Sequence, residues 1–104
     1  MESKTIHVRV LTAQGLVLED DAVSVVAPGE LGYLGVLYNH APLVTTLQPG
    51  KLTWRRPFGP AQARRIGAGL LEIAQNRLTI LTDAVSNLSD EAHEARPAGT
   101  LPGP

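Results

Sequence analysis

Residues 25–50 read VVAPGELGYLGVLYNHAPLVTTLQPG, and this stretch decides the fold class. It contains two short apolar runs, residues 34–38 and 43–47, which an Asn-His-Ala-Pro turn separates and a Pro-Gly turn follows. Short apolar runs bounded by such turn residues are typical of β-strands in an all-β domain.

Three glycines, Gly29, Gly32 and Gly35, recur at every third position of this stretch and predict a flexible loop. Leu31, Tyr33 and Leu34 lie between them, and hydrophobic side chains on such a loop are hard to bury within the same small domain. The spacing differs from the dinucleotide-binding fingerprint, and a strand follows where the phosphate-binding helix should begin. The loop therefore predicts a surface that docks a partner, rather than an active site.

Alternating apolar residues predict further strands on both sides of this stretch. In residues 5–11, Ile6, Val8 and Val10 point one way and His7 and Arg9 the other, which is the period of a half-buried strand. Predicted strands at intervals of about ten residues, with turn residues between them, favour a two-sheet antiparallel β-sandwich. The predicted strands are residues 5–11, 16–18, 22–27, 34–38, 43–47, 51–56, 63–67, 70–74 and 77–82.

The connections are predicted from their turn chemistry. Gln75 and Asn76 form a tight turn between the last two strands, since Asn tolerates positive φ. The acidic residues 19–21 are predicted to be a solvated turn. Ser89 is a suitable N-cap for one short helix that Pro97 ends, and a disordered tail follows. We therefore divide the chain into a β-sandwich domain, residues 1–86, and a segment with a helix start and tail, residues 87–104.

Composition limits the possible functions. The chain has 104 residues, a net charge of −1 and no cysteine, so neither disulfides nor thiolate metal sites are expected. The three histidines are scattered, no nucleophile motif is present, and we expect neither catalysis nor a metal or other cofactor. No apolar run is long enough for a transmembrane helix and no signal-peptide core is evident, which predicts a soluble protein without direct membrane insertion.

The same residues carry a resemblance to the N-terminal domain of the epsilon subunit family of F-type ATP synthases. The matching positions in the central stretch are Val25, Val26, Ala27, Pro28, Gly29, Glu30, Gly32, Gly35, Val36, Leu37, His40, Ala41, Pro42, Leu43, Pro49 and Gly50. Residues 69–73 and 78–83 resemble the glycine-led hairpin of the family, so the likeness covers roughly residues 5–90. It implies a β-sandwich of about ten strands in a non-catalytic rotor subunit at the cytoplasmic face of the bacterial inner membrane. The implied partners are the gamma subunit and the c-ring, and the implied role is to couple proton flow to ATP synthesis.

The resemblance also assigns the docking residues. The expected partner-binding positions are Gly32, Tyr33, Leu34, Gly35, Asn39, His40, Ala41, Pro42 and Leu43. Tyr33 replaces a glutamate of the family, so we expect a more apolar and less salt-sensitive contact, with Leu34 as its apolar anchor. The chain offers no counterpart to the two C-terminal helices or to the ATP-binding motif of the family. Inhibition by helix insertion and ATP sensing are therefore not expected.

Two other classes stay open from the residues alone. Arg55, Arg56, Arg64 and Arg65 flank one predicted hairpin near Trp54 and Phe58, and cations beside aromatic rings could bind single-stranded nucleic acid. The alternative is that these arginines occupy the outer face of an edge hairpin, where charge blocks aggregation. A small β-sandwich enzyme or ligand carrier would need a concave pocket with converging polar groups.

Overall fold

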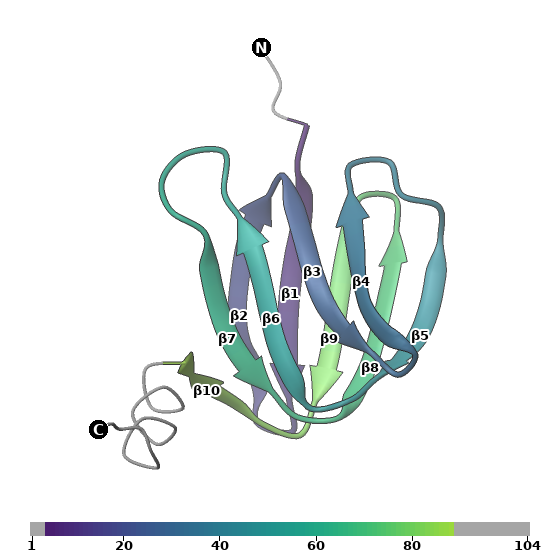
Figure 1. Ribbon diagram of the computed structural model, residues 1–104, viewed down its shortest axis with the longest axis vertical. Helices are drawn as coiled ribbons and strands as arrows, with labels where there is room; N and C mark the ends of the chain where they lie inside the picture. Colours follow the sequence, from purple (N-terminus) through teal and green to yellow (C-terminus); the bar gives the residue numbers. More distant parts are fainter. Residues whose placement is uncertain (1–3, 89–104) are drawn as a thin grey trace, which may run out of the picture.

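Ten strands make up most of residues 4–88, the part of the chain that this computed structural model describes (Figure 1). They are β1 (Ile6–Thr12), β2 (Gly15–Ala22), β3 (Ser24–Gly29), β4 (Gly32–Leu37), β5 (Leu43–Leu47), β6 (Gly50–Arg55), β7 (Gln62–Ile66), β8 (Gly69–Ala74), β9 (Arg77–Thr82) and β10 (Val85–Asn87). The all-β fold of about ten short strands is thus confirmed. The helix predicted to start at Ser89 and the predicted tail lie outside the described residues.

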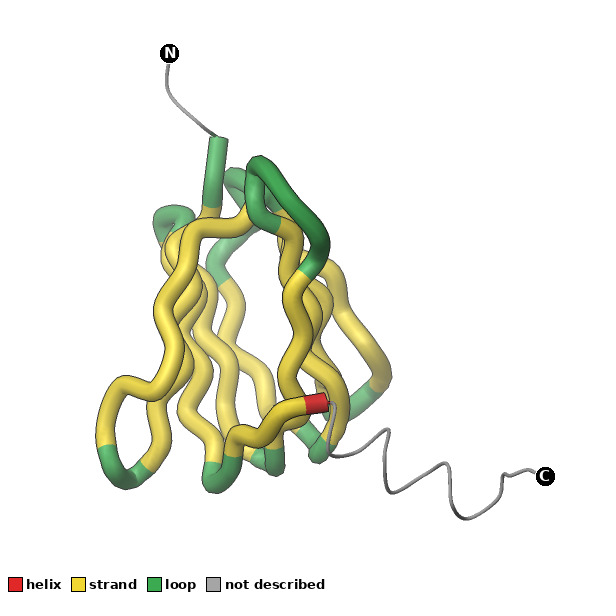
Figure 2. The backbone as a smooth tube through the Cα atoms, turned by 90° about the vertical axis from the view of Figure 1, so that its left-hand side faces the viewer, coloured by secondary structure: helices red, strands yellow, loops and turns green. Residues whose placement is uncertain are grey.

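One continuous sheet folds over on itself to give two facing layers (Figures 1 and 2). The strand order is β10-β7-β6-β3-β5-β8-β9-β1-β2, and β4 pairs with β3 beside this path. Strands β3 and β5 meet at a single residue pair, Gly29 with Leu47, and there the sheet passes from one layer to the other. All pairs are antiparallel except β1 with β9, so the sheet is mixed and nearly closed.

The interior is filled by alternate residues of both layers, as the sequence pattern predicts. In β1, the side chains of Ile6, Val8 and Val10 are buried, while His7 and Arg9 lie between them on the outer face. Trp54 is the largest fully buried side chain. The core residues are Ile6, Val8, Val10, Ala22, Val25, Ala27, Val36, Leu47, Leu52, Trp54, Ile66, Leu71, Ile73, Leu78 and Ile80.

Of two turns predicted from the sequence, the structure confirms one and contradicts the other. Gln75 and Asn76 both have positive φ, 53° and 61°, which is the conformation of a two-residue hairpin turn and confirms that prediction. The acidic residues 19–21 are not a turn, because β2 continues through them to Ala22 and pairs with β1 along its length. Cross-strand pairing outweighs the turn propensity of these residues. The carboxylates of Glu19 and Asp21, on the outer face, contact the side chain of His7.

Two segments without a predicted strand are also paired. Residues 28–33, predicted as a loop, belong to the β3–β4 hairpin, and β10 pairs with β7 from Val85 to Asn87. At Gly69, the start of β8, a Cβ atom would lie 1.9 Å from the carbonyl oxygen of Leu81. That close approach explains why a glycine leads this hairpin.

Candidate docking surfaces

The three glycines lie on a tight hairpin rather than on a flexible loop. Gly29 pairs with Gly32, so Glu30 and Leu31 alone form the turn between β3 and β4. Gly32 has φ 132°, a conformation that L side chains rarely adopt, which explains the glycine there. The side chain of Leu31 is fully exposed at the tip. We refer to residues 29–35 as the glycine hairpin.

The two hydrophobic residues of this hairpin have different environments. Leu34 is half-buried and packs against the core, so the structure does not present it as an exposed anchor. Tyr33 is 57% exposed, and its hydroxyl accepts a hydrogen bond from the backbone N–H of Lys51 at 3.1 Å. The expectation that this segment cannot bury its hydrophobic residues is therefore wrong for Leu34 but fits Leu31 and Tyr33. The reason is the strand period, which turns alternate residues of β4 inward.

The His40 turn, residues 38–42, is held by hydrogen bonds to its neighbours. Asn39 has φ 66°, and its backbone N–H donates to Oδ1 of Asn76 at 2.6 Å, while Nδ2 of Asn76 donates to Oδ1 of Asn39 at 3.1 Å. Nδ1 of His40 donates to the carbonyl of Ala41 at 2.6 Å. Ala41 and Pro42 are exposed, and Leu43, which begins β5, packs against the core.

The predicted docking residues do not gather at one place. The β3–β4 turn of the glycine hairpin and the His40 turn lie at opposite ends of β4, and so at opposite ends of the sandwich (Figure 1). With about 3.3 Å per residue, Gly32 and Leu37 are about 17 Å apart along the strand. The nine residues therefore lie in two groups, towards the two ends of β4.

A second exposed apolar surface was not predicted from the sequence. Leu70 is the register partner of Leu81, Leu81 of Leu11, and Leu11 of Leu16, so these four side chains form one row across β8, β9, β1 and β2. Leu16, Leu70 and Leu81 are each about half exposed on the outer face. We call these four residues the leucine row. The alternation within each strand indicates that each leucine faces outward. Only the register between the strands shows that the four positions are aligned.

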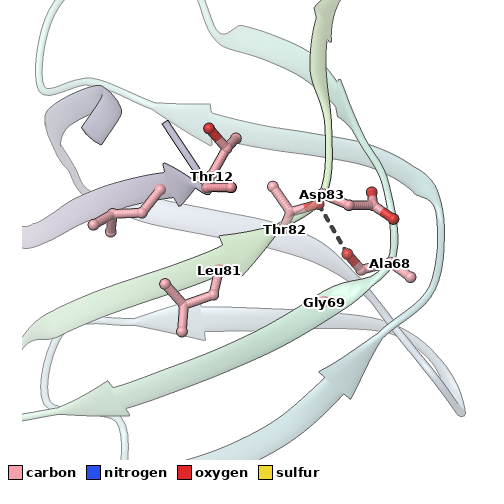
Figure 3. A pocket seen from close by; sticks show the side chains of 8 residues that line it. Thr12, Ala68, Gly69, Leu81, Thr82 and Asp83 are labelled. Carbon is pink, nitrogen blue, oxygen red and sulfur yellow. Dashed lines mark hydrogen bonds between the residues drawn. The ribbon is translucent and has the colours of Figure 1, made fainter. Parts of the chain in front are cut away.

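Two open hollows flank Leu81 in this row. One, of about 420 Å³, is lined by residues that include Leu11, Thr12, Gly69 and Leu81 (Figure 3). The other, of about 280 Å³, is lined by Val44, Leu70, Leu71, Glu72, Thr79 and Leu81. In the first, Oγ1 of Thr82 and the backbone N–H of Asp83 both donate to the carbonyl of Ala68, at 3.0 and 3.3 Å. These polar groups are used within the chain, so the hollow is an uneven apolar surface rather than a pocket with converging polar groups.

The hairpin that carries Arg55, Arg56, Arg64 and Arg65 does not offer the exposed pair of aromatic rings that the nucleic-acid alternative needs. Trp54 is 2% exposed, and its indole N–H donates to Oδ2 of Asp20 at 2.8 Å, so the ring is not available for base stacking. Nε of Arg56 donates to the same carboxylate oxygen at 2.6 Å. Arg64 lies over the buried ring of Trp54, 5.8 Å from its centroid. Of the two aromatic residues, Phe58 alone is exposed, in the β6–β7 loop.

On the outer face, the imidazole of His7 contacts two carboxylates. Nδ1 of His7 lies 2.9 Å from Oδ1 of Asp21, and Nε2 lies 2.5 Å from Oε2 of Glu19. Between Lys4 and Leu88, no group of three His, Cys, Asp or Glu side chains is placed to hold a metal ion. Within the same range, the structure has no helix with the length and apolar character needed to cross a bilayer.

Comparison with known families gives one match that covers most of the chain. The family described as ATP synthase, Delta/Epsilon chain, beta-sandwich domain, matches residues 5–87. The ATP synthase epsilon chain of Acidithiobacillus ferridurans is 40% identical over 91% of this chain and 74% of its own length. That of Moorella thermoacetica is 40% identical over 76% of this chain and 59% of its own length. That of Chloroflexus aurantiacus is 38% identical over 88% and 64%, so this chain spans about three fifths to three quarters of these relatives.

Solved structures share the fold at low sequence identity. A chain in the Euglena gracilis mitochondrial ATP synthase, in a structure of OSCP, F1 and c-ring, superposes with a TM-score of 0.82 at 20% identity, over 92% of this chain and 61% of its own. A chain in the central stalk and c-ring of the Tetrahymena thermophila mitochondrial ATP synthase gives 0.70 at 17% identity, over 86% and 70%. These likenesses support the arrangement of strands described above.

Proposed function

We propose, because this chain belongs to the delta/epsilon family of ATP synthase subunits, that it is a rotor component joining two neighbours in the central stalk. Members of this family are non-catalytic epsilon chains of the complex. In this proposal one surface packs on the gamma subunit and another contacts the c-ring. The protein sits peripherally at the cytoplasmic face of the bacterial membrane and helps couple proton flow to ATP synthesis.

The leucine row is the surface that we assign to the gamma subunit. Four aligned leucines across four strands, with three of them about half exposed, are the observation that carries this assignment. A contiguous apolar surface bordered by charged residues is typical of a protein–protein interface. The border here is the row formed by Glu72, Thr79, Arg9 and Glu19.

The tip of the glycine hairpin is the part that we assign to the c-ring. Leu31 is fully exposed at the tip, and Tyr33 follows it on the outer face. The tip and the leucine row lie at the same end of the sandwich, where the β3–β4 and β1–β2 turns are both found (Figure 1). The backbone of a two-residue turn is already ordered before binding, so little backbone entropy is lost in such a contact. The sandwich behind it is close-packed and of low compressibility, so torque passes through it with little elastic loss.

The leucine row is tested by placing a charge on it. We expect Leu81→Asp to weaken capture of the gamma subunit at least about tenfold, because the carboxylate must lose water at a buried interface. The matched control is Phe58→Asp, which makes the same kind of change at a residue that is 88% exposed in the β6–β7 loop. Equal capture of wild type and Leu81→Asp, with both folded by circular dichroism, would overturn the assignment of this surface.

A further inference from the structure

Strand β4 has one edge that no other strand covers. It pairs with β3 over its whole length, and no other strand among residues 4–88 pairs with it. The carbonyl of Pro28 accepts from the N–H of Gln48, so Pro28 directs its backbone away from β4. In an antiparallel pair the backbone groups alternate in direction. Tyr33, the β4 partner of Pro28, therefore directs its N–H and C=O groups to the uncovered edge. Gly35 and Leu37 follow at alternate positions of β4, so their N–H and C=O groups point the same way.

The backbone groups on this edge are largely unused within the described chain. The carbonyl of Leu37 accepts from the N–H of His40 at 3.0 Å, which agrees with the deduced direction. The N–H groups of Tyr33, Gly35 and Leu37 donate to no described residue. Gly35 stands at the centre of the edge, and a Cβ atom there would have no neighbour within 4 Å. The edge therefore presents accessible donors without a side chain at its midpoint.

The two ends of the sheet show how this fold protects other edges. Strand β2 carries the run Glu19, Asp20 and Asp21, and β10 has only three residues. Charge and shortness are ordinary means of preventing an added strand. Strand β4 reads GYLGVL, with no charge and no proline, and Tyr33 and Leu37 are 57% and 62% exposed on its outer face. An edge of this composition is suited to being covered in an assembly.

We infer that an extended segment of a neighbouring stalk polypeptide pairs with the open edge of β4. It adds a further strand to the layer that contains β3, β4, β6 and β7. This inference rests on the proposed function and specifies how that site binds. The occupant is uncharged, with apolar side chains at alternate positions that meet Tyr33 and Leu37 on one face. On the other face it meets Leu43 and Thr45, half-buried on β5, which lies beyond β4 in Figure 1. Main-chain hydrogen bonds supply the affinity in such strand addition.

The division of the predicted docking residues supports the same mode of binding. The β3–β4 turn of the glycine hairpin and the His40 turn lie at the two ends of β4, about 17 Å apart by strand geometry. An extended segment that runs along the open edge of β4 would reach both groups. Side-chain contacts at the two ends then fix the register of the added strand.

A pair of variants at Gly35 separates backbone from side-chain recognition. Gly35→Pro removes the central N–H of the edge, whereas Gly35→Ala keeps it and adds one methyl group in open space. With full-length chain and rotor partners, Gly35→Pro is compared with Gly35→Ala, because both add a side chain at this position and only proline removes the N–H. Gly35→Pro should bind at least about fivefold more weakly, the change that corresponds to one lost hydrogen bond, and its fold is checked by circular dichroism.

Amide hydrogen exchange on the wild type makes the test independent of whether Gly35→Pro folds. In the assembled complex the N–H groups of Tyr33, Gly35 and Leu37 should exchange at least about tenfold more slowly than in the free chain. Unchanged exchange at these amides in a wild-type complex that does assemble overturns strand addition and leaves the stalk placement standing. Failure of the wild type to assemble overturns both. Slowed exchange that appears with self-association of the chain alone, seen by sedimentation, overturns the choice of occupant.

Discussion

At the scale of single residues, His7 carries the clearest pH-dependent contribution to stability. Hydrogen bonds to Asp21 and then Glu19 raise the pKa of its imidazole above the usual 6.5, and partial burial opposes them. Arg77 and Arg9 stand on the same outer face, as the β9 partner of His7 and as the next outward residue of β1. The bonds to the two carboxylates decide the direction of the shift.

The sign of this shift predicts how stability varies with pH. Because the folded-state pKa is raised, the contribution of His7 is fully present below about pH 6.5 and is lost as the pH rises through the folded-state value. Urea unfolding should therefore show a larger stability loss for His7→Gln at about pH 5.5 than at about pH 8.5. Arg9→Gln is the control, since an arginine side chain does not titrate in this range. Equal losses for His7→Gln at both pH values would contradict the prediction.

At the scale of elements, two turns support each other at the end of the sandwich that carries the His40 turn. The side chain of Asn76, in the β8–β9 turn, exchanges two hydrogen bonds with Asn39. The carbonyl of Asn76 also accepts from the N–H of His7 at 2.9 Å. Asn76 is therefore a link between three segments that are distant in the sequence.

Replacing this side chain separates its bonds from its backbone conformation. We expect Asn76→Gly to lower the free energy of unfolding by about 1 kcal/mol, because exposed hydrogen bonds are lost while positive φ stays accessible. Asn76→Ala should cost roughly 1 kcal/mol more, since alanine is strained at φ 61°. Denaturant unfolding of the two variants measures both terms. If Asn76→Gly were as stable as wild type, the hydrogen bonds between the two turns would contribute nothing to the free energy of unfolding.

The elements also show which features the sequence could predict. Period-2 alternation predicts most of the strands and the buried face of β1, because the burial of alternate residues is visible in the local sequence. The sequence predicts a loop at the turn end of the β3–β4 hairpin, because proline and glycine are typical strand breakers. Pro28 is compatible with the strand because it directs its backbone away from β4. The leucine row depends on the register between β1, β8 and β9, which are far apart in the sequence, so no local pattern contains it.

At the scale of the whole molecule, Asp20 ties one end of the sheet to the facing layer. Its side chain lies on the inner face of edge strand β2 and accepts from Trp54, in β6, and from Arg56, directly after β6. Burial alone would raise the pKa of this carboxyl. The hydrogen bonds from Arg56 and Trp54 outweigh that effect, and the pKa is lowered. The sequence indicated only three acidic residues in a row, so this bridge could not be predicted from it.

Removing the charge of Asp20 tests this tie between the layers. Asp20→Asn should lower the free energy of unfolding by about 2 kcal/mol at neutral pH, since charge-assisted hydrogen bonds to partly buried groups are lost. Because the folded-state pKa is depressed, the wild-type advantage is present above the ordinary value of 3.8 and is lost as the pH falls through the folded-state value. Urea midpoints of both proteins, measured from neutral pH downward, should therefore converge in acid. The control change Glu72→Gln, at an exposed carboxylate on the outer face of β8, should leave the neutral-pH midpoint nearly unchanged. A midpoint for Asp20→Asn equal to that of wild type at neutral pH would mean that the two layers are held at this edge by apolar packing alone.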